Sequence, residues 1–249
     1  MDLELEGRVA IVTGAGRGLG RAATLALAAE GVRVLAAARS LDELRGLERE
    51  CGESVRAQPC DMRDRVQVAG LVQAAIAAFG RLDIVVNNAG IAPANAFLEM
   101  PFEVWDEVFA VNVTALALIS QAAARHFAAA TGGKIINVAS TSGILGKATL
   151  AAYSASKGAV LQLTKSLAAE WARYNIQVNA IAPGAFATEA QRAVLDDPEL
   201  KARRVRKIPA RRMAEPLEIG PLVCYLASPK SNFVSGAVYV IDGGETAKQ

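Results

Sequence analysis

The fold of this chain is decided by residues 8–20, RVAIVTGAGRGLG. A short apolar, β-branched run predicts a buried strand over 8–12, and the Ala-rich segment that follows predicts a helix from about 18 to 30. Between them, Gly14, Gly18 and Gly20 form a G-x-x-x-G-x-G pattern. Glycines permit positive φ and let a diphosphate approach the backbone, while a helix N-terminus supplies amide donors. A turn made only for tight packing is the alternative, but the position between a strand and a helix favours dinucleotide binding.

The same alternation of apolar strands and longer helical segments continues along the chain. Such a pattern predicts a doubly wound α/β fold of the Rossmann type, with helices on both faces of a parallel sheet and right-handed crossovers. No linker, repeat or change of composition divides residues 1–249, so we expect a single domain. The seven strands are predicted at 8–12, 33–37, 54–60, 84–87, 134–139, 177–181 and 238–241. The helices are predicted at 18–30, 41–50, 64–79, 101–130 with a break near Val111, and 151–174.

The composition of the chain indicates which classes of protein it could belong to. Of 249 residues, 52% are hydrophobic and only 5% aromatic, which is typical of buried parallel strands under Ala-rich helices. A net charge of +2 argues against nucleic acid as a partner. The first residues lack the features of a signal peptide, and we expect no apolar run to approach the roughly 20 residues of a membrane span. With three unpaired cysteines, these features predict a cytoplasmic protein without a membrane anchor.

Polar and small residues follow several of the predicted strands directly. They are Gly14, Asp61, Asn88, Ser140 and Pro183. Ligands of doubly wound sheets bind beyond the carboxyl ends of the strands, where the strand order reverses. We therefore expect these residues to share one rim of the sheet and one binding crevice.

A Tyr and a Lys stand four residues apart in the predicted helix 151–174. At this spacing the side chains of Tyr153 and Lys157 emerge from the same helix face. An ammonium close to a phenol favours the phenolate, which brings the phenol's pKa towards the working range of a proton donor or acceptor. A Tyr-x-x-x-Lys pair alone is common on surface helices. Its weight here comes from the glycine loop upstream.

Taken together, these residues resemble the short-chain dehydrogenase/reductase family in its compact single-domain form. The glycine loop looks like the family's cofactor loop, and residues 87–90, NNAG, are similar to its segment after the fourth strand. Asn112, Ser140, Tyr153 and Lys157 fall in the order of its catalytic tetrad. The resemblance implies nicotinamide chemistry and, commonly, a homotetramer. The predicted cofactor-binding residues are Gly14, Arg17, Gly18, Leu19, Gly20, Arg39, Asp61, Met62, Asn88, Ala89, Gly90, Tyr153, Lys157, Pro183, Gly184 and Thr188.

The resemblance also implies a role for each member of the tetrad. Tyr153 is expected to be the general acid in reduction and the general base in oxidation. Lys157 is expected to bind the nicotinamide ribose and to lower the pKa of Tyr153. Ser140 is expected to hydrogen-bond the substrate oxygen as negative charge develops on it. Asn112 is expected to position a water that links Lys157 to solvent.

The residue at the carboxyl end of the second predicted strand indicates whether the cofactor is NAD or NADP. An acidic side chain there pairs with the ribose 2′-hydroxyl of NAD, whereas the 2′-phosphate of NADP requires positive charge. This chain has Ala38 at that position, Arg39 after it and Arg17 in the glycine loop. Guanidinium groups bind phosphate through paired hydrogen bonds, which favours NADP over NAD. The alternative is that both arginines are only solvated loop residues, and Asp42 is a nearby acid that opposes NADP.

The segment 185–215 departs from the repeating pattern and is expected to form a lid over the substrate. The pocket is expected to be lined by 94–97, 142–150 and Phe186. The lid carries a basic run that predicts either recognition of an anionic substrate or a solvated face, of which the second is the simpler. Its cations are Lys201, Arg203, Arg204, Arg206, Lys207, Arg211 and Arg212. Parts of this region look like the sugar-acid 5-dehydrogenases, and 3-oxoacyl carrier-protein reductases share most of the same features.

Three functions therefore remain open at this point. The first is an NADP-linked oxidoreductase acting on a ketone or secondary alcohol. The second is a catalytically silent dinucleotide-binding module, which the complete tetrad argues against. The third is a sugar-nucleotide epimerase, which the chain length and the glycine spacing argue against. No metal site is expected, since the single histidine, His126, has no second ligand at metal-binding spacing.

Overall fold

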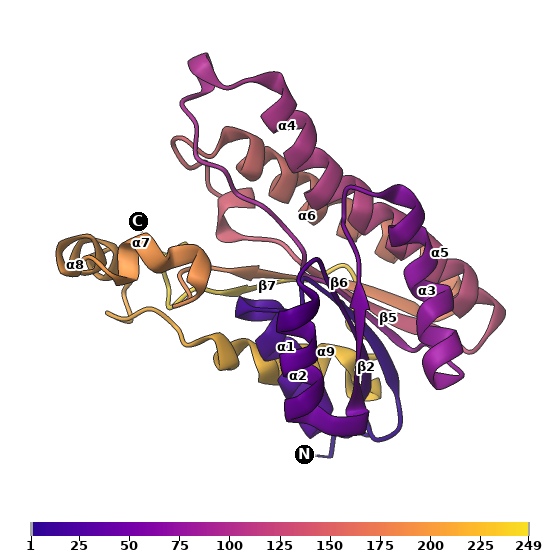
Figure 1. Ribbon diagram of the computed structural model, residues 1–249. Coiled ribbons are helices and arrows are strands. Elements are labelled where there is room, and N and C mark those ends of the chain that lie inside the picture. Colours follow the sequence, from indigo (N-terminus) through magenta and orange to yellow (C-terminus); the bar gives the residue numbers. More distant parts are fainter. Residues whose placement is uncertain (1, 249) are drawn as a thin grey trace.

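The computed structural model describes residues 2–248 and contains in them one sheet of seven parallel strands (Figure 1). The strand order is β3-β2-β1-β4-β5-β6-β7, so the direction of winding reverses between β1 and β4. This confirms the predicted doubly wound sheet and all seven predicted strands. The strands are β1 Val9–Thr13, β2 Arg33–Ala38, β3 Val55–Pro59, β4 Ile84–Asn87, β5 Gly133–Val138, β6 Ile176–Pro183 and β7 Val238–Ile241.

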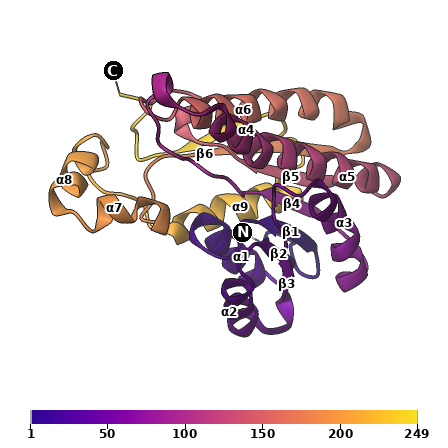
Figure 2. The same ribbon diagram turned by 45° about the horizontal axis from the view of Figure 1, so that its top comes forward.

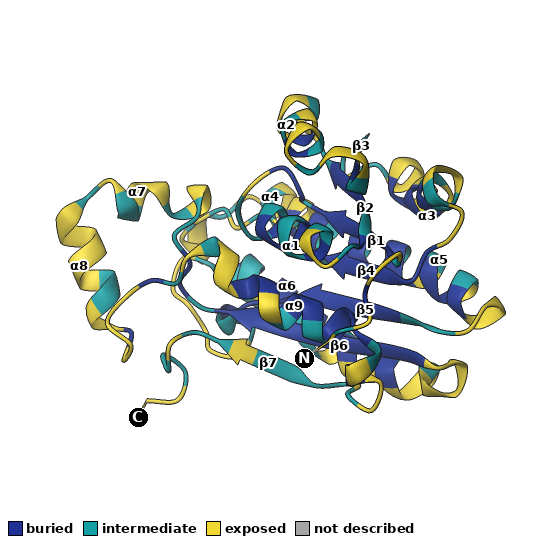
Figure 3. Ribbon diagram, turned by 90° about the horizontal axis from the view of Figure 1, so that it is seen from below, coloured by how far each residue is buried: buried dark blue, intermediate teal, exposed yellow. Residues whose placement is uncertain are grey.

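Helices cover both faces of the sheet, as the strand pattern predicts. One core cluster packs α1, α2 and α9 on one face, and a second packs α3, α5 and α6 on the other. In Figure 3 the central strands are dark blue between these layers, the edge strand β7 is teal and yellow, and the outward helix faces are largely yellow. The helices are α1 Gly18–Ala29, α2 Leu41–Cys51, α3 Arg65–Phe79, α4 Phe102–Phe109, α5 Ala115–Ala129, α6 Ala151–Trp171, α7 Arg192–Leu195, α8 Pro198–Arg206 and α9 Gly220–Ala227.

The first strand shows why its sequence is apolar throughout. Ala10 and Val12 belong to the core cluster on one face, and Val9 and Ile11 belong to the cluster on the other. All four are fully buried. A strand covered on both faces cannot alternate apolar with polar residues, so its sequence reads as a continuous apolar run.

Side-chain caps mark the starts of two helices, and one of them accounts for the one-residue shift at the predicted start of α3. Asp64 lies just before α3, where its side chain accepts hydrogen bonds from the backbone N–H groups of Val66 and Gln67. Ser40 caps α2 in the same way through the N–H of Glu43. Such caps satisfy amide groups that the first helical turn leaves without partners.

The predicted break near Val111 is a π-helical turn rather than an interruption. The backbone remains helical from α4 through Ala110–Thr114 and into α5. A π-turn inserts one residue into the helical repeat and rotates the side chains that follow it. The polar Asn112 lies within this turn and is only 1% exposed.

The same segment corrects the expectation about apolar length. Helix Phe102–Ala129 has 28 residues and a window of mean hydropathy 1.5, which by length and composition alone would be enough to cross a membrane. Half of that window is buried inside the protein, where it includes Asn112 and Ser120. Core helices of soluble proteins meet the same criterion, so the segment is weak evidence for a membrane span.

The chain between β6 and α9 leaves the sheet at its carboxyl edge. It contains α7 and α8, which project beyond the sheet (Figure 2). A bridge between Phe186 and Ala214 joins the two ends of the segment. Ala185, Ile208 and Met213 form a small separate core beneath it. The expected lid region therefore has a small core of its own, and its ends also contact the main core and the C-terminal residues.

Candidate active site

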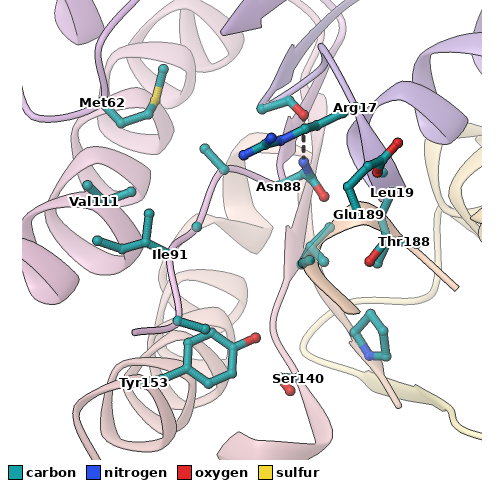
Figure 4. A pocket seen from close by; sticks show the side chains of 18 of the residues that line it. Arg17, Leu19, Met62, Asn88, Ile91, Val111, Ser140, Tyr153, Thr188 and Glu189 are labelled. Atoms are coloured by element: carbon teal, nitrogen blue, oxygen red, sulfur yellow. Dashed lines mark hydrogen bonds between the residues drawn. The ribbon is translucent and has the colours of Figure 1, made fainter. Parts of the chain in front are cut away.

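A cavity of about 820 Å³ opens at the carboxyl edge of the sheet, on both sides of the point where the winding reverses. All five residues expected to share this rim line it, namely Gly14, Asp61, Asn88, Ser140 and Pro183. The other predicted residues that line it are Arg17, Gly18, Leu19, Arg39, Met62, Ala89, Gly90, Tyr153, Lys157, Gly184 and Thr188. Figure 4 shows Arg17 reaching across the cavity from the glycine loop, with Tyr153 and Ser140 close together below it.

Two predicted residues, Gly20 and Asn112, do not line the cavity. Gly20 lies behind the glycine loop, where an added Cβ would come within 2.2 Å of the Gly14 carbonyl oxygen and 2.4 Å of Asn88 Nδ2. Asn88 Nδ2 donates to the carbonyl oxygens of Thr13 and Gly14 at 2.9 and 3.2 Å. Gly20 therefore lets the start of α1 approach the loop closely, and its predicted contact with the cofactor stays a prediction.

We predict that Gly20→Ala destabilises the protein by more than about 2 kcal/mol, because the methyl group would meet fixed backbone rather than a movable side chain. Gly70→Ala is the matched control. Gly70 lies inside α3 with nothing within 4 Å of an added Cβ, so the substitution should stabilise by up to about 1 kcal/mol. Urea unfolding of both variants checks this, and equal stability of the two would contradict the close approach at Gly20.

Tyr153 presents its phenol to the cavity from the first turn of α6. Burial raises the pKa of Tyr153 above its ordinary value, and a hydrogen bond with Ser140 partly lowers it. Ser140 lies just beyond β5, where its Oγ also accepts a hydrogen bond from the Ser142 backbone N–H at 3.1 Å. The phenol is therefore held as a proton donor at neutral pH, next to a hydroxyl whose position is fixed.

Lys157 lies one helical turn beyond Tyr153 and is 3% exposed. Its Nζ donates to the Val138 carbonyl oxygen at 2.7 Å and lies 5.8 Å from the centre of the Tyr153 ring. Burial lowers the pKa of Lys157 to about 8. The two side chains share one helix face, as their spacing predicts. In this structure the influence that lowers the pKa of Tyr153 comes from Ser140, so the expected influence of Lys157 stays a prediction.

Asn112 lies behind the cavity wall, and its expected role in positioning a water near Lys157 stays a prediction. Its Oδ1 accepts from the Ile91 N–H at 2.8 Å, and its Nδ2 donates to Ile91 O and to Ser156 Oγ, each at 3.0 Å. Ser156 Oγ in turn donates to the Tyr153 carbonyl oxygen at 2.7 Å. Asn112 thus joins the loop after β4 to the helix turn that carries Tyr153. The sequence analysis missed Ser156, although its position three residues after Tyr153 places it near the same face of α6.

The far end of the cavity gathers charged residues. Arg17, Arg39 and Arg63 line it, as do Asp61 and Glu43. Asp61 pairs with Arg63 at 2.6 Å, and this contact is the main cause that lowers the pKa of Asp61 to about 2. Glu43, rather than the expected Asp42, is the acid of α2 that reaches the wall, where its carboxylate lies against Gly16.

The substrate side differs from expectation in two respects. Residues 94–97 do not line the cavity, because Asn95 N–H is bonded to Thr149 O at 2.8 Å and Phe97 packs against Trp105. None of the seven basic lid residues lines it either. Arg204 is paired with Glu245 by two bonds of 2.5 and 2.7 Å, and Arg212 is paired with Glu218. Ion pairs inside the protein thus occupy Arg204 and Arg212, and the role of the other basic residues stays a prediction.

Lys147 is the cation that the loop between Ser140 and α6 contributes to this side of the cavity. Lys147 is exposed at the cavity rim, where partial desolvation is the main cause that lowers its pKa and the nearby charge of Arg204 adds to it. Phe186 also lines the cavity, as expected, but it is 3% exposed and packs into the core cluster of α1 and α9. Among residues 2–248, no group of three or more potential metal ligands is present.

Comparison with known proteins identifies the family to which this chain belongs. Residues 14–246 match a family model described as enoyl-(acyl carrier protein) reductase. The chain belongs to the short-chain dehydrogenases/reductases. Within this family it is similar to the 2-dehydro-3-deoxy-D-gluconate 5-dehydrogenase of Escherichia coli (strain K12), at 38% identity over 98% of this chain and 97% of that protein. It is 34% identical to the 3-oxoacyl-(acyl-carrier-protein) reductase FabG of Vibrio cholerae serotype O1, over 97% and 98% of the two chains.

A solved relative has nearly the same fold. The gluconate 5-dehydrogenase of Burkholderia cenocepacia J2315, in complex with NADP and tartrate, superimposes with a TM-score of 0.93 at 36% identity, covering 100% of this chain and 98% of that one. As a short-chain dehydrogenase/reductase, the present chain is an NAD(P)-dependent oxidoreductase acting on CH-OH groups.

The residues present fit a nicotinamide dinucleotide. Gly14 and Gly18 have φ of 64° and 55°, so the loop keeps a backbone path that side chains would strain, and both glycines border the cavity. The start of α1 points its free amide groups at the same place, which suits a diphosphate. When bound, the cofactor supplies the hydride chemistry. The protein supplies position, charge and the proton.

Proposed function

We propose that this protein is an NADP-dependent oxidoreductase that interconverts a ketone and a secondary alcohol, with Tyr153 as general acid and base. The observation that carries the proposal is the group formed by Tyr153, Ser140 and the buried Lys157 at one end of the cavity. The raised pKa of Tyr153 keeps the phenol protonated, as donation to a developing alkoxide requires.

Each neighbour of Tyr153 has a separate task in this proposal. The Ser140 hydroxyl, fixed by the Ser142 N–H, donates to the substrate oxygen as negative charge develops there. Lys157 provides an ammonium close to the phenol and binds the nicotinamide ribose. Asn112 and Ser156 hold the backbone of α6 so that the phenol keeps its position. Water positioned near Asn112 and Lys157, a homotetrameric assembly, a lid over 185–215 and a cytoplasmic location belong to the proposal as expectations.

The preference for NADP rests on the charge at the far end of the cavity. Arg17 and Arg39 are exposed, line the wall and have no ion-pair partner among the described residues. Arg63 is committed to Asp61 and Glu107. The solved gluconate 5-dehydrogenase relative was in complex with NADP, which supports the same preference here. Glu43 opposes it, since a carboxylate on this wall would repel a 2′-phosphate.

We predict that Arg39→Ala weakens NADPH binding by about tenfold to a hundredfold, the effect of losing a charge-assisted hydrogen bond, and leaves NADH binding nearly unchanged. Fluorescence titration of both cofactors measures the ratio. Arg45→Ala is the control, because Arg45 is exposed on α2 outside the cavity. A wild-type preference for NADH would contradict the cofactor assignment while leaving the proposed oxidoreductase chemistry intact.

A sugar acid is the substrate class we favour. The relatives named for 2-dehydro-3-deoxy-D-gluconate and gluconate act on carboxylate-bearing polyols. In this chain Lys147 is suited to the carboxylate, since it lines the cavity from the loop between Ser140 and Tyr153. Its neighbour Arg204 is already neutralised by Glu245.

We predict that Lys147→Met raises the KM for 5-keto-gluconate by about tenfold or more and leaves the KM for an uncharged ketone within about twofold. Arg203→Met is the control, because Arg203 is exposed on α8 and does not line the cavity. Steady-state kinetics with both substrates decides the point. Equal changes for acidic and neutral substrates would remove Lys147 as the carboxylate-binding residue.

The alternative substrate is a 3-oxoacyl thioester on an acyl carrier protein. Its support is the family model described for enoyl-(acyl carrier protein) reductase and the 3-oxoacyl reductase relative. The deciding experiment compares kcat/KM for 5-keto-gluconate, a 3-oxoacyl thioester and simple diketones with NADPH and with NADH. Turnover of the thioester alone would favour the alternative. Cofactor binding with no turnover of any substrate would leave two explanations, a different substrate or the silent module.

A further inference from the structure

A second cavity, of about 220 Å³, lies away from the active site. Its lining includes Arg8, just before β1, Asp83, just before β4, and Lys134, at the start of β5. It therefore lies at the amino ends of the strands, on the edge of the sheet opposite the proposed active site. No residue of this cavity has a part in the proposed reaction.

Lys134 is the unusual group of this cavity, because it is a cation that is only 5% exposed. Its Nζ donates to Asn232 Oδ1 at 2.7 Å and to Ser231 Oγ at 3.3 Å, and both of these acceptors are neutral. None of the ion pairs among the described residues includes it. An ammonium has three hydrogens to donate, and a buried charge without a counter-charge is unfavourable.

The carboxylate on the cavity wall is already committed elsewhere. Asp83 Oδ2 accepts from the Val9 N–H and from Arg81 Nε, each at 2.9 Å, and Oδ1 accepts from Arg81 Nη2 at 2.6 Å. Arg8 uses its Nε for the Glu4 carbonyl oxygen and forms no ion pair among the described residues. The described wall has a formal charge of +2, because it carries three cations, Arg8, Arg81 and Lys134, and one carboxylate, Asp83.

The wall is also rigid before any ligand arrives. Asn175 Nδ2 donates to the Thr131 carbonyl oxygen at 2.8 Å, and the Gly133 N–H donates to the Asn175 carbonyl oxygen at 3.2 Å. Gly132, at φ of 100°, lies so close to Asn175 that an added Cβ would be 2.2 Å from its carbonyl oxygen. The loop before β5 is therefore held in place by bonds that do not involve the three cations.

We propose that this cavity binds a small dianionic oxyanion of the phosphate class, with Lys134 as its buried ligand and Arg8 as a second cation. The charge of such an anion matches the charge of the wall. Its oxygens would accept the hydrogens of Lys134 and Arg8 that protein acceptors leave free. A water molecule occupies about 30 Å³ in the liquid. The cavity volume of about 220 Å³ therefore has room for the anion and several waters. Burial and the charge of Arg8 hold the pKa of Lys134 near 8, and a bound dianion would oppose both influences.

The test is a titration with inorganic phosphate followed by thermal unfolding, in parallel with sodium chloride at matched ionic strength. A ligand that binds only the folded state raises Tm, and the stabilisation grows with ligand concentration as RT ln(1 + [L]/Kd). We expect phosphate to do this in the wild type. We expect Lys134→Met to raise the phosphate Kd fitted from the Tm shifts by at least about tenfold, because the variant loses a buried charged contact. Any phosphate that binds at Arg17 and Arg39 contributes equally to both proteins and drops out of the comparison.

Two further variants keep the result interpretable. Arg8→Gln should weaken the phosphate response in the same direction, and it decides the matter if Lys134→Met does not fold. Arg125→Gln, on the exposed face of α5, should behave as the wild type. The proposal is overturned if chloride reproduces the phosphate effect. It is equally overturned if the Lys134→Met and Arg8→Gln variants respond to phosphate as the wild type does, which would leave Lys134 a structural tie to Ser231 and Asn232.

Discussion

Replacing Tyr153 by Phe should lower kcat for ketone reduction by about 10³-fold or more, with NADPH binding and fold retained. The substitution removes one oxygen and keeps the ring, so packing at the start of α6 should be preserved. What is lost is the only phenol that the described cavity wall presents beside Ser140. A hydroxyl whose pKa is raised by burial is a proton donor at neutral pH, and Phe offers no replacement for it.

Single-turnover and steady-state rates with the same ketone measure this loss, and cofactor fluorescence measures binding. Tyr174→Phe is the matched control, since Tyr174 lies near the far end of the same helical segment and is 40% exposed. The control should be fully active. If Tyr153→Phe kept more than about a tenth of wild-type turnover, another group would have to be the acid.

The sequence was sufficient for the fold because its signals are local. Strand β1 is apolar on both faces, and Gly80 ends α3 at φ of 83°, so each boundary is encoded within a few residues. The rule that parallel strands end on one edge then brings Gly14, Asn88 and Ser140 together without further information. That prediction was confirmed, since all three line the cavity.

Features of the site that depend on contacts between distant residues could not be predicted from the sequence. The sequence predicted a break near Val111, but not that the break is a π-turn at Ala110–Thr114, which leaves Asn112 behind the wall. The basic lid could not be interpreted because the partner of Arg204 is Glu245, 41 residues away. Lys147 had no motif around it and gained significance only from its place on the cavity wall.

Replacing Lys157 by Met should change activity and stability in ways that differ with pH. Activity should fall by at least about a hundredfold, since the ammonium next to Tyr153 is lost. For stability, the pKa of Lys157 in the folded protein is about 8, below its ordinary 10.5. Keeping Lys157 protonated therefore lowers the free energy of unfolding of the wild type, and the Met variant has no such penalty. Below pH 8 the wild type carries this cost in full.

As pH rises from about 8 to 10.5, the folded wild type releases the proton while the unfolded chain still holds it. The free energy of unfolding of the wild type should thus rise relative to that of Lys157→Met, by an amount on the order of 3 kcal/mol across this window. The Val138 carbonyl loses its partner in the variant at every pH, so that loss shifts the difference without changing its slope. Urea unfolding of both proteins between pH 7 and 10.5 measures the slope, with exposed Lys165→Met as the control that should show none. If the difference in unfolding free energy did not change with pH, Lys157 would not be a buried ammonium with a lowered pKa. A lowered pKa means that the folded protein loses stability in order to keep a charge that the reaction needs.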